Sequence, residues 1–203
     1  MIPYAARTGT RRNLAELRYH EWRLLVSARG VLRTEGFPYA LDNGAWTAFQ
    51  RNEPFDERAF DIAVDRLGAD ADFIVVPDIV CGGMRSLEYS LSWLDRLRGV
   101  APLVLAVQDG MTVDDLRPLL GPDVGVAVGG STEWKESTTF MWWRLAREMN
   151  ARCHVLRVNT LRRLNICIHA GATSFDGSSA SRYSKTCARL TQELRRPRLF
   201  QGP

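Results

Sequence analysis

Several signals that would reveal a function at once are absent from this chain. Its four cysteines, Cys81, Cys153, Cys167 and Cys187, include no C-x-x-C pair, so neither a zinc ribbon nor another metal site is expected. All four are interpreted as small buried apolar residues. No G-x-G-x-x-G or P-loop motif is present, and no cofactor is predicted. No apolar run approaches the roughly 20 residues of a membrane helix, and the N-terminal MIPYAARTGTRR lacks the apolar segment of a signal peptide. We therefore expect a cytoplasmic protein without membrane contact.

The 203 residues suit one domain, 1–203, with a sizeable core. The final LFQGP resembles part of a viral 3C-type protease site, so 198–203 is interpreted as a tail or a cloning remnant. Charge is unevenly spread: residues 1–50 carry 7 basic and 4 acidic side chains, and 151–203 carry 10 and 2, whereas the middle is acidic. If the fold joins the two ends, one side of the molecule suits a polyanion such as nucleic acid. Otherwise these charges are ordinary solvated helix faces.

Short apolar runs alternate with longer amphipathic segments. The near-continuous runs FIVV and LVLAV are typical of strands buried on both faces, hence of a parallel sheet. Eight such units predict an α/β fold, a compact (β/α)8 TIM-type barrel, with an open doubly wound sheet as the alternative. The expected strands are 2–6, 22–28, 39–42, 72–80, 102–108, 124–130, 153–159 and 173–177. The expected helices are 11–20, 56–67, 84–97, 113–119, 133–149, 161–170 and 182–195, with none in 30–37.

In a barrel, chemistry lies at the carboxyl ends of the strands. Those ends carry three acids, an amide, a glycine pair and an arginine: Asp42, Asp78, Gln108, Gly129, Gly130, Arg157 and Asp176. Clustered carboxylates repel one another and shift each other's pKa values, and such repulsion is tolerated where a function needs it. Carboxylates, an amide and backbone N–H groups complement the donors and acceptor of a guanine edge. A remaining carboxylate can attack an anomeric carbon.

Structural interpretations of the same residues remain open. Asp176, in SFDGSSAS, is also placed to cap the next helix, and Gly129–Gly130 to form a tight turn. Asp109 is interpreted as a cap of the next segment. Three histidines (His20, His154 and His169) and two tryptophans (Trp142 and Trp143) are interpreted as structural or packing residues. Trp46, in the loop after Asp42, is the predicted stacking residue.

Five segments, in order, resemble motifs of the tRNA-guanine transglycosylase superfamily. ALDNGAWTAF resembles its Asp-Ser-Gly-Gly-Phe-Gln segment, VVPDIV its base-reading strand, VLAVQDG its Val-Gln-Gly strand, VAVGGSTE its Gly-Gly-Leu segment, and SFDGSSASR its Phe-Asp segment. The resemblance spans residues 40–182 and implies the same barrel. It implies that Asp176 is the nucleophile of a covalent glycosyl-enzyme and Asp42 the proton-shuttling carboxylate. Asp78, Gln108 and Gly130 would read the base, and Arg182 would hold a flanking phosphate.

Two departures from that family change the expected substrate. The Cys-x-Cys-x2-Cys…His zinc site is missing after Asp176, and no added RNA-binding domain is present. The chain is more similar to the short, phage- or island-encoded DpdA-type branch, which places 7-deazaguanines in DNA. This implies exchange of guanine in DNA for a free base such as 7-cyano-7-deazaguanine. The residues expected along the DNA are Arg11, Arg12, Arg162, Arg163, Arg182 and Lys185. A tRNA enzyme with a partner protein and a non-catalytic nucleic-acid-binding barrel are the alternatives.

Overall fold

The computed structural model describes residues 1–197 and is a closed barrel of eight parallel strands. Each strand pairs with the next along the chain, and the last pairs with the first in the register Tyr4 to Asp176. The strands are β1 Ile2–Ala6, β2 Arg23–Ser27, β3 Tyr39–Asp42, β4 Ile74–Val75, β5 Leu103–Val107, β6 Val124–Val128, β7 Cys153–Val155 and β8 Ser174–Gly177. The predicted (β/α)8 architecture is thus confirmed, and the open doubly wound sheet is excluded. The prediction for 198–203 lies outside the described residues.

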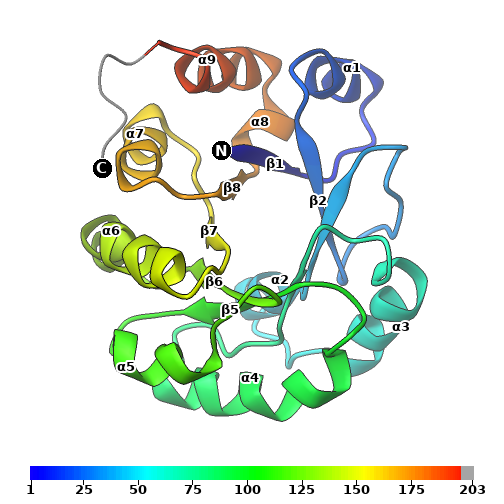
Figure 1. The fold of residues 1–203 in the computed structure, drawn as a ribbon. Coiled ribbons are helices and arrows are strands. Elements are labelled where there is room, and N and C mark those ends of the chain that lie inside the picture. Colours follow the sequence, from blue (N-terminus) through cyan, green and yellow to red (C-terminus); the bar gives the residue numbers. More distant parts are fainter. Residues whose placement is uncertain (198–203) are drawn as a thin grey trace.

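The helices follow one another around the strands in chain order (Figure 1). They are α1 Arg11–Tyr19, α2 Ala45–Gln50, α3 Glu57–Leu67, α4 Met84–Leu97, α5 Val113–Leu116 with the 3-10 turn η1 Arg117–Leu119, α6 Thr132–Glu148, α7 Leu161–Ala170, α8 Ser179–Arg182 and α9 Ser184–Leu194. All seven predicted helices are present, although 113–119 is α5 plus η1 and 182–195 begins after the separate α8. The short α2 was not predicted.

Local signals explain where several helices begin and end. Thr112 and Asp115 form a reciprocal capping box at the start of α5, which satisfies N–H groups that the helix itself cannot pair. Gly171 follows α7 in the left-handed conformation, with φ of 86°, the usual glycine cap of a helix end. The chain therefore turns sharply at both points and keeps the connections between strands and helices short.

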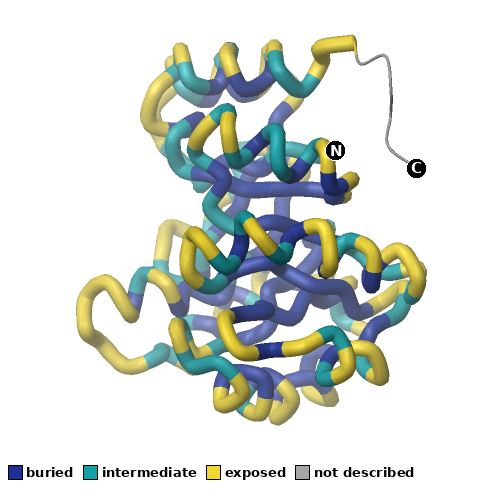
Figure 2. Tube along the Cα trace, turned by 90° about the vertical axis from the view of Figure 1, so that its left-hand side faces the viewer, coloured by how far each residue is buried: buried dark blue, intermediate teal, exposed yellow. Residues whose placement is uncertain are grey.

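The core has two layers, and buried residues gather in the interior (Figure 2). The larger layer lies between strands and helices and includes Trp22, Phe60, Trp142 and Phe175. The smaller cluster fills the barrel itself with side chains from six strands or their immediate ends: Tyr4, Leu25, Ala40, Phe73, Val75, Val104 and Ala127. Because successive side chains of a strand point to opposite faces, one strand can supply side chains to both layers.

Barrel closure places the two basic ends of the chain side by side. Helix α1 contacts both α8 and α9, and the Asn13 side-chain amide donates to the Ser181 carbonyl at 2.6 Å. Trp22 Nε1 donates to Thr191 Oγ1 at 2.8 Å across the same junction. The expectation that closure joins the basic N-terminal and C-terminal quarters is therefore confirmed.

The cysteine prediction can be compared with the described residues directly. Three cysteines are buried, as expected, whereas Cys81 is exposed on the loop after β4, so its interpretation as a buried apolar residue is wrong. Among residues 1–197, no helix is long and apolar enough to cross a membrane. The same residues contain no cluster of three His, Cys, Asp or Glu side chains with metal-binding geometry.

Candidate active site

A cavity of about 510 Å³ opens at the carboxyl ends of the strands. Its volume falls within the range of roughly 300–1,000 Å³ that small-molecule sites occupy. Ten of the predicted site residues line it: Asp42, Trp46, Asp78, Gln108, Gly129, Gly130, Arg157, Arg163, Asp176 and Arg182. Residues from β3 and β8 and from the segments directly after β4, β5, β6 and β7 thus converge on one mouth, as the barrel geometry predicts.

Asp176 lies inside β8 and is only 7% exposed. Its Oδ1 accepts a hydrogen bond from the Arg157 backbone N–H at 3.1 Å and lies 3.3 Å from Nε2 of His154. Both partners come from β7 or its end, because β7 is the neighbour of β8 in the barrel. The carboxylate is therefore oriented by the neighbouring strand.

The segment after Asp176 shows why this acid is not a helix cap. The Ser179 N–H, at the start of α8, donates to Asn159 Oδ1 at 2.9 Å instead of to Asp176. A Cβ at Gly177 would lie 2.5 Å from the Val158 carbonyl oxygen, so only glycine fits against the end of β7. Gly177 therefore lets the end of β8 approach the segment after β7 closely, and the capping interpretation of Asp176 is wrong.

Asp42, the last residue of β3, faces the same cavity. Burial raises its pKa to about 6, and the negative charges of Asp176 and Asp78 add to that effect. The Gly44 backbone N–H donates to Asp42 Oδ2 at 3.2 Å. A carboxyl group with this pKa exchanges protons near neutral pH, which is the property that general acid–base catalysis requires.

Asp78 is held by two side-chain amides. Gln108 Nε2 donates to Asp78 Oδ2 at 2.9 Å, and Asn43 Nδ2 donates to Asp78 Oδ1 at 2.8 Å. Burial raises the pKa of Asp78 to about 6 despite these bonds. Gln108 Oε1 in turn accepts from the Gly82 N–H at 3.1 Å, so both ends of the Gln108 amide have protein partners. Gln108 therefore orients Asp78, and its direct contact with a base stays a prediction.

The Gly129–Gly130 pair forms the turn between β6 and α6. Gly130 has a φ of 73°, and a Cβ there would lie 2.4 Å from Asp109 Oδ2. Asp109 accepts from the N–H and the hydroxyl of Ser131, the residue that caps α6. Asp109 thus supports the start of α6, whereas the next helix, α5, is capped by Thr112 and Asp115. The prediction that Asp109 caps the segment that follows it is wrong. Gly130 is required by this turn, and both glycines also line the cavity.

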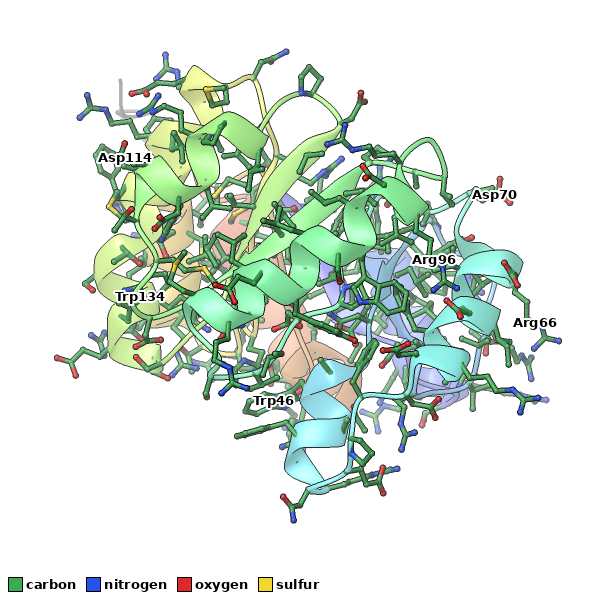
Figure 3. The ribbon with its side chains drawn as sticks, turned by 90° about the horizontal axis from the view of Figure 1, so that it is seen from below. Trp46, Arg66, Asp70, Arg96, Asp114 and Trp134 are labelled. Carbon is green, nitrogen blue, oxygen red and sulfur yellow. The ribbon has the colours of Figure 1, made fainter. Side chains whose placement is uncertain are left out.

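Arg157 and Trp46 meet across the mouth of the cavity. The Arg157 guanidinium lies over the Trp46 ring, 3.9 Å from its centre, and donates to the Gly130 carbonyl at 3.1 Å. Trp46 lies in the first turn of α2 and not in the predicted loop (Figure 3), and its ring also stacks on Phe49. Its stacking on a base stays a prediction. An arginine over an indole face is a stabilising cation–π contact. The pair forms an aromatic and cationic rim above the three carboxylates.

The predicted nucleic-acid residues divide into three groups. Arg182 and Arg163 line the cavity, but Arg163 also pairs with Glu136. Arg162 lies outside the cavity and pairs with the same Glu136 at 2.8 Å. Arg11, Arg12 and Lys185 are exposed on α1 and α9, away from the cavity lining. The structure therefore brings Arg182 and Arg163 to the mouth and leaves the others on the adjacent flank or in an ion pair.

Three buried polar residues at the site were not predicted. His154 Nδ1 lies 2.9 Å from Ser174 Oγ beneath Asp176, although the sequence suggested a structural histidine away from the site. Asn43 contacts Asp78, and its position directly after Asp42 in a strand-end segment was the available signal. Lys135 lines the cavity from α6. A search limited to residues at strand ends could not identify Lys135, because it lies one helical turn beyond the Gly129–Gly130 turn.

A second cavity, of about 870 Å³, lies away from the carboxylates, between the N-terminus of β1 and helices α6, α7 and α9. Its lining includes Phe140, Trp143 and His169, and Pro197 marks the limit of the described chain beside it. It contains no pair of carboxylates, so the mouth of the barrel is the candidate active site. Comparison of the chain with protein-family models and with curated proteins gives no match.

Proposed function

We propose that the protein is a DNA guanine transglycosylase, which exchanges guanine in DNA for a free 7-deazaguanine base through a glycosyl-enzyme on Asp176. The observation that carries the proposal is the single cavity shared by Asp176, Asp42 and the hydrogen-bonded Asp78–Gln108 pair. A nucleophile, a proton carrier and a base-recognition group are the three parts that such an exchange needs.

The proposed exchange has two half-reactions. In the first, an Asp176 carboxylate oxygen bonds to C1′ of the deoxyribose as the C1′–N9 bond breaks, and protonated Asp42 gives its proton to the leaving guanine. In the second, Asp42 takes the N9 proton of the incoming base, N9 bonds to C1′, and the bond from C1′ to Asp176 breaks. Asp42 with a pKa of about 6 serves in both directions, because it loses and regains a proton at similar cost near neutral pH.

Base recognition is assigned to Asp78. Its carboxylate accepts hydrogen bonds, and the base edge of guanine and of 7-deazaguanines offers N1–H and N2–H₂ donors. Asn43 and Gln108 fix the two Asp78 oxygens, which orients the remaining lone pairs. A base that lacks these donors would leave the remaining lone pairs of the buried Asp78 without a partner, at a cost of about 1–3 kcal/mol. This cost would select guanine and 7-deazaguanines over bases that lack the two donors.

The DNA is proposed to lie across the flank formed by α1, α8 and α9. The exposed cations of this flank include Arg11, Arg12, Arg182 and Lys185. Among the described residues none forms an ion pair with these four side chains, so they are available for phosphates. The target nucleotide must leave the base stack to reach the buried Asp176, so single-stranded or mismatched DNA should react at least as well as a perfect duplex.

Incubation with radiolabelled guanine and either DNA or tRNA tests the proposal. Label incorporated into DNA by the wild type, and not by Asp176→Asn, is the expected result. Incorporation into tRNA alone would contradict the DNA assignment and favour the tRNA enzyme. Nucleic-acid binding without incorporation into either polymer would instead favour the non-catalytic barrel.

A further inference from the structure

Lys135 is an unusual residue in this chain. Of the 27 basic residues, only Lys135 and Lys185 are lysines, and Lys135 is only 3% exposed. Buried lysines are rare unless a partner compensates the lost hydration of the ammonium. Its position in α6, at the wall of the cavity that contains Asp176, calls for such a partner.

The partner is one peptide group at the end of β7. Lys135 Nζ donates to the Leu156 carbonyl oxygen at 2.6 Å. The N–H of that same peptide group belongs to Arg157, and it donates to Asp176 Oδ1 at 3.1 Å. The ammonium, the peptide and the carboxylate thus form one hydrogen-bonded chain, in which the charge at one end polarises the bond at the other.

The backbone at this point is held in an uncommon conformation. Arg157 has a φ of 58°, the left-handed region that non-glycine residues seldom adopt and that costs on the order of 1 kcal/mol. Such a conformation persists only where the surroundings fix it. The bonds to Lys135 and to Asp176 fix the two polar ends of the Leu156–Arg157 peptide.

We propose that Lys135 is a positioning residue: through the Leu156–Arg157 peptide it holds the Asp176 carboxylate in the orientation for attack on the sugar. The assignment of Asp176 as nucleophile rests on the proposed function, whereas the hydrogen-bonded chain does not. Lysine suits this role better than arginine, because a compact ammonium makes a single short bond in a confined space.

Charged groups from every neighbouring element act on Lys135. Burial and the cations of Arg157 and Arg163 lower its pKa to about 8, whereas the negative charge of Asp176 opposes that shift. Cys167 keeps its proton at this pH, since burial raises its pKa to about 12. Lys135 therefore begins to lose its proton slightly above neutral pH, and the polarisation of the chain weakens there.

The test follows the Arg157 amide by hydrogen exchange in the full-length protein. Lys135→Met keeps the length of the side chain but removes the charge and the donor, and we expect exchange of the Arg157 amide to accelerate by about 10-fold or more. Thr139→Val is the matched control: Thr139 is buried one turn further along α6 and donates to the Lys135 carbonyl. This control should leave the Arg157 amide protected. An Arg157 amide that is equally protected in Lys135→Met and the wild type would overturn the proposal.

A second measurement needs no variant, so it holds even if Lys135→Met fails to fold. In the wild type, the Arg157 amide proton signal should titrate with a midpoint at about pH 8, the pKa of Lys135. A signal that stays constant through this range would contradict the link.

Single-turnover kinetics then connect the link to the reaction. Formation of the glycosyl-enzyme should fall about 10- to 100-fold in Lys135→Met, with the dissociation constant for the free base unchanged and with partial recovery in Lys135→Arg. Equal rates in Lys135→Met and the wild type would reject the positioning role. If the Arg157 amide responds as expected but the wild type modifies no nucleic acid, the hydrogen-bonded chain stands and the proposed function is the part that fails.

Discussion

The two ends of the barrel treat the same residue type in opposite ways. At the amino end, Asp72 accepts from Tyr4 Oη at 2.8 Å and from an Arg23 guanidinium nitrogen at 2.7 Å. At the carboxyl end, Asp42 and Asp78 are buried with pKa values raised to about 6. Within residues 1–197 neither of these two forms an ion pair with an arginine or lysine. The amino end thus pairs its acid with an arginine, whereas the carboxyl end keeps Asp42 and Asp78 buried without such a pair.

This difference separates structure from chemistry. A carboxylate paired with arginine and a tyrosine links β1, β2 and the start of β4, which stabilises the barrel. Buried carboxylates that repel one another reduce stability, and they persist where a reaction uses them. Removing acids from the two ends should therefore have opposite consequences.

The largest effect is expected at Asp176. Asp176→Asn keeps the shape of the side chain but removes the nucleophile, so guanine exchange should fall by about 10⁴-fold or more. The measurement is incorporation of labelled guanine into single-stranded DNA, with unfolding curves of both proteins as the control for folding. Retention of wild-type exchange in this variant would show that Asp176 is not the nucleophile.

Asp42→Asn should lower guanine exchange by about 10²–10⁴-fold, because no carboxyl group then carries the proton.

The same variant should unfold with a larger free energy than the wild type at neutral pH. Folding raises the pKa of Asp42 from 3.8 to about 6, so the protonated acid contributes stability below about pH 4 that is lost as the pH rises through about 6. The variant should therefore gain about 1–3 kcal/mol relative to the wild type between about pH 4 and pH 8. Denaturant unfolding of both proteins at pH 4 and at pH 8 measures this gain. An equal difference in unfolding free energy at the two pH values would mean that burial does not destabilise the charged form of Asp42.

Asp72→Asn should do the reverse at the amino end. It removes the charge that Arg23 and Tyr4 share, and the partly exposed position limits the loss to about 1–2 kcal/mol of unfolding free energy. Exchange per folded molecule should stay at the wild-type rate. A large loss of activity in this variant, with folding intact, would remove the distinction between the two ends.

The smallest effect is expected on the basic flank. Replacing Arg11 and Arg12 by alanine should reduce the slope of log affinity for DNA against log salt by about 0.7–0.9 per lost phosphate contact, without changing the accepted base. Asp78→Asn is the matched comparison, since it should change base selection and leave the salt slope unaltered. A slope that is the same in the Arg11/Arg12 variant would place the DNA path elsewhere.

Much of this fold could be predicted from the sequence, because parallel strands buried on both faces give uninterrupted apolar runs. The run Leu103–Val107 and the helix Met84–Leu97 illustrate this. Helix α2 was missed, since six residues are too few for a periodic pattern, and it starts after Gly44 at a φ of 83°. The expected strand 72–80 is only Ile74–Val75, as the chain after it turns away to place Asp78.

The candidate site was predictable only where it follows strand ends. That rule located Asp42, Asp78, Gln108 and Asp176, which the structure brings to one cavity. It could not locate Lys135, whose link to Asp176 passes through a peptide of another element. His154 was missed for a different reason: it faces the barrel interior beneath Asp176, where its contacts with Tyr4 and Phe73 resemble those of a packing residue.

The most direct test of the central claim is the identity of the residue that carries the sugar. DNA containing the target guanine is incubated with the protein, the reaction is quenched with denaturant, and the adduct is digested and sequenced by mass spectrometry. The account predicts a deoxyribose-linked peptide bonded at Asp176, absent from Asp176→Asn and present at wild-type levels in Asp72→Asn. Base exchange without any adduct in the wild type, or an adduct on another residue, would contradict it.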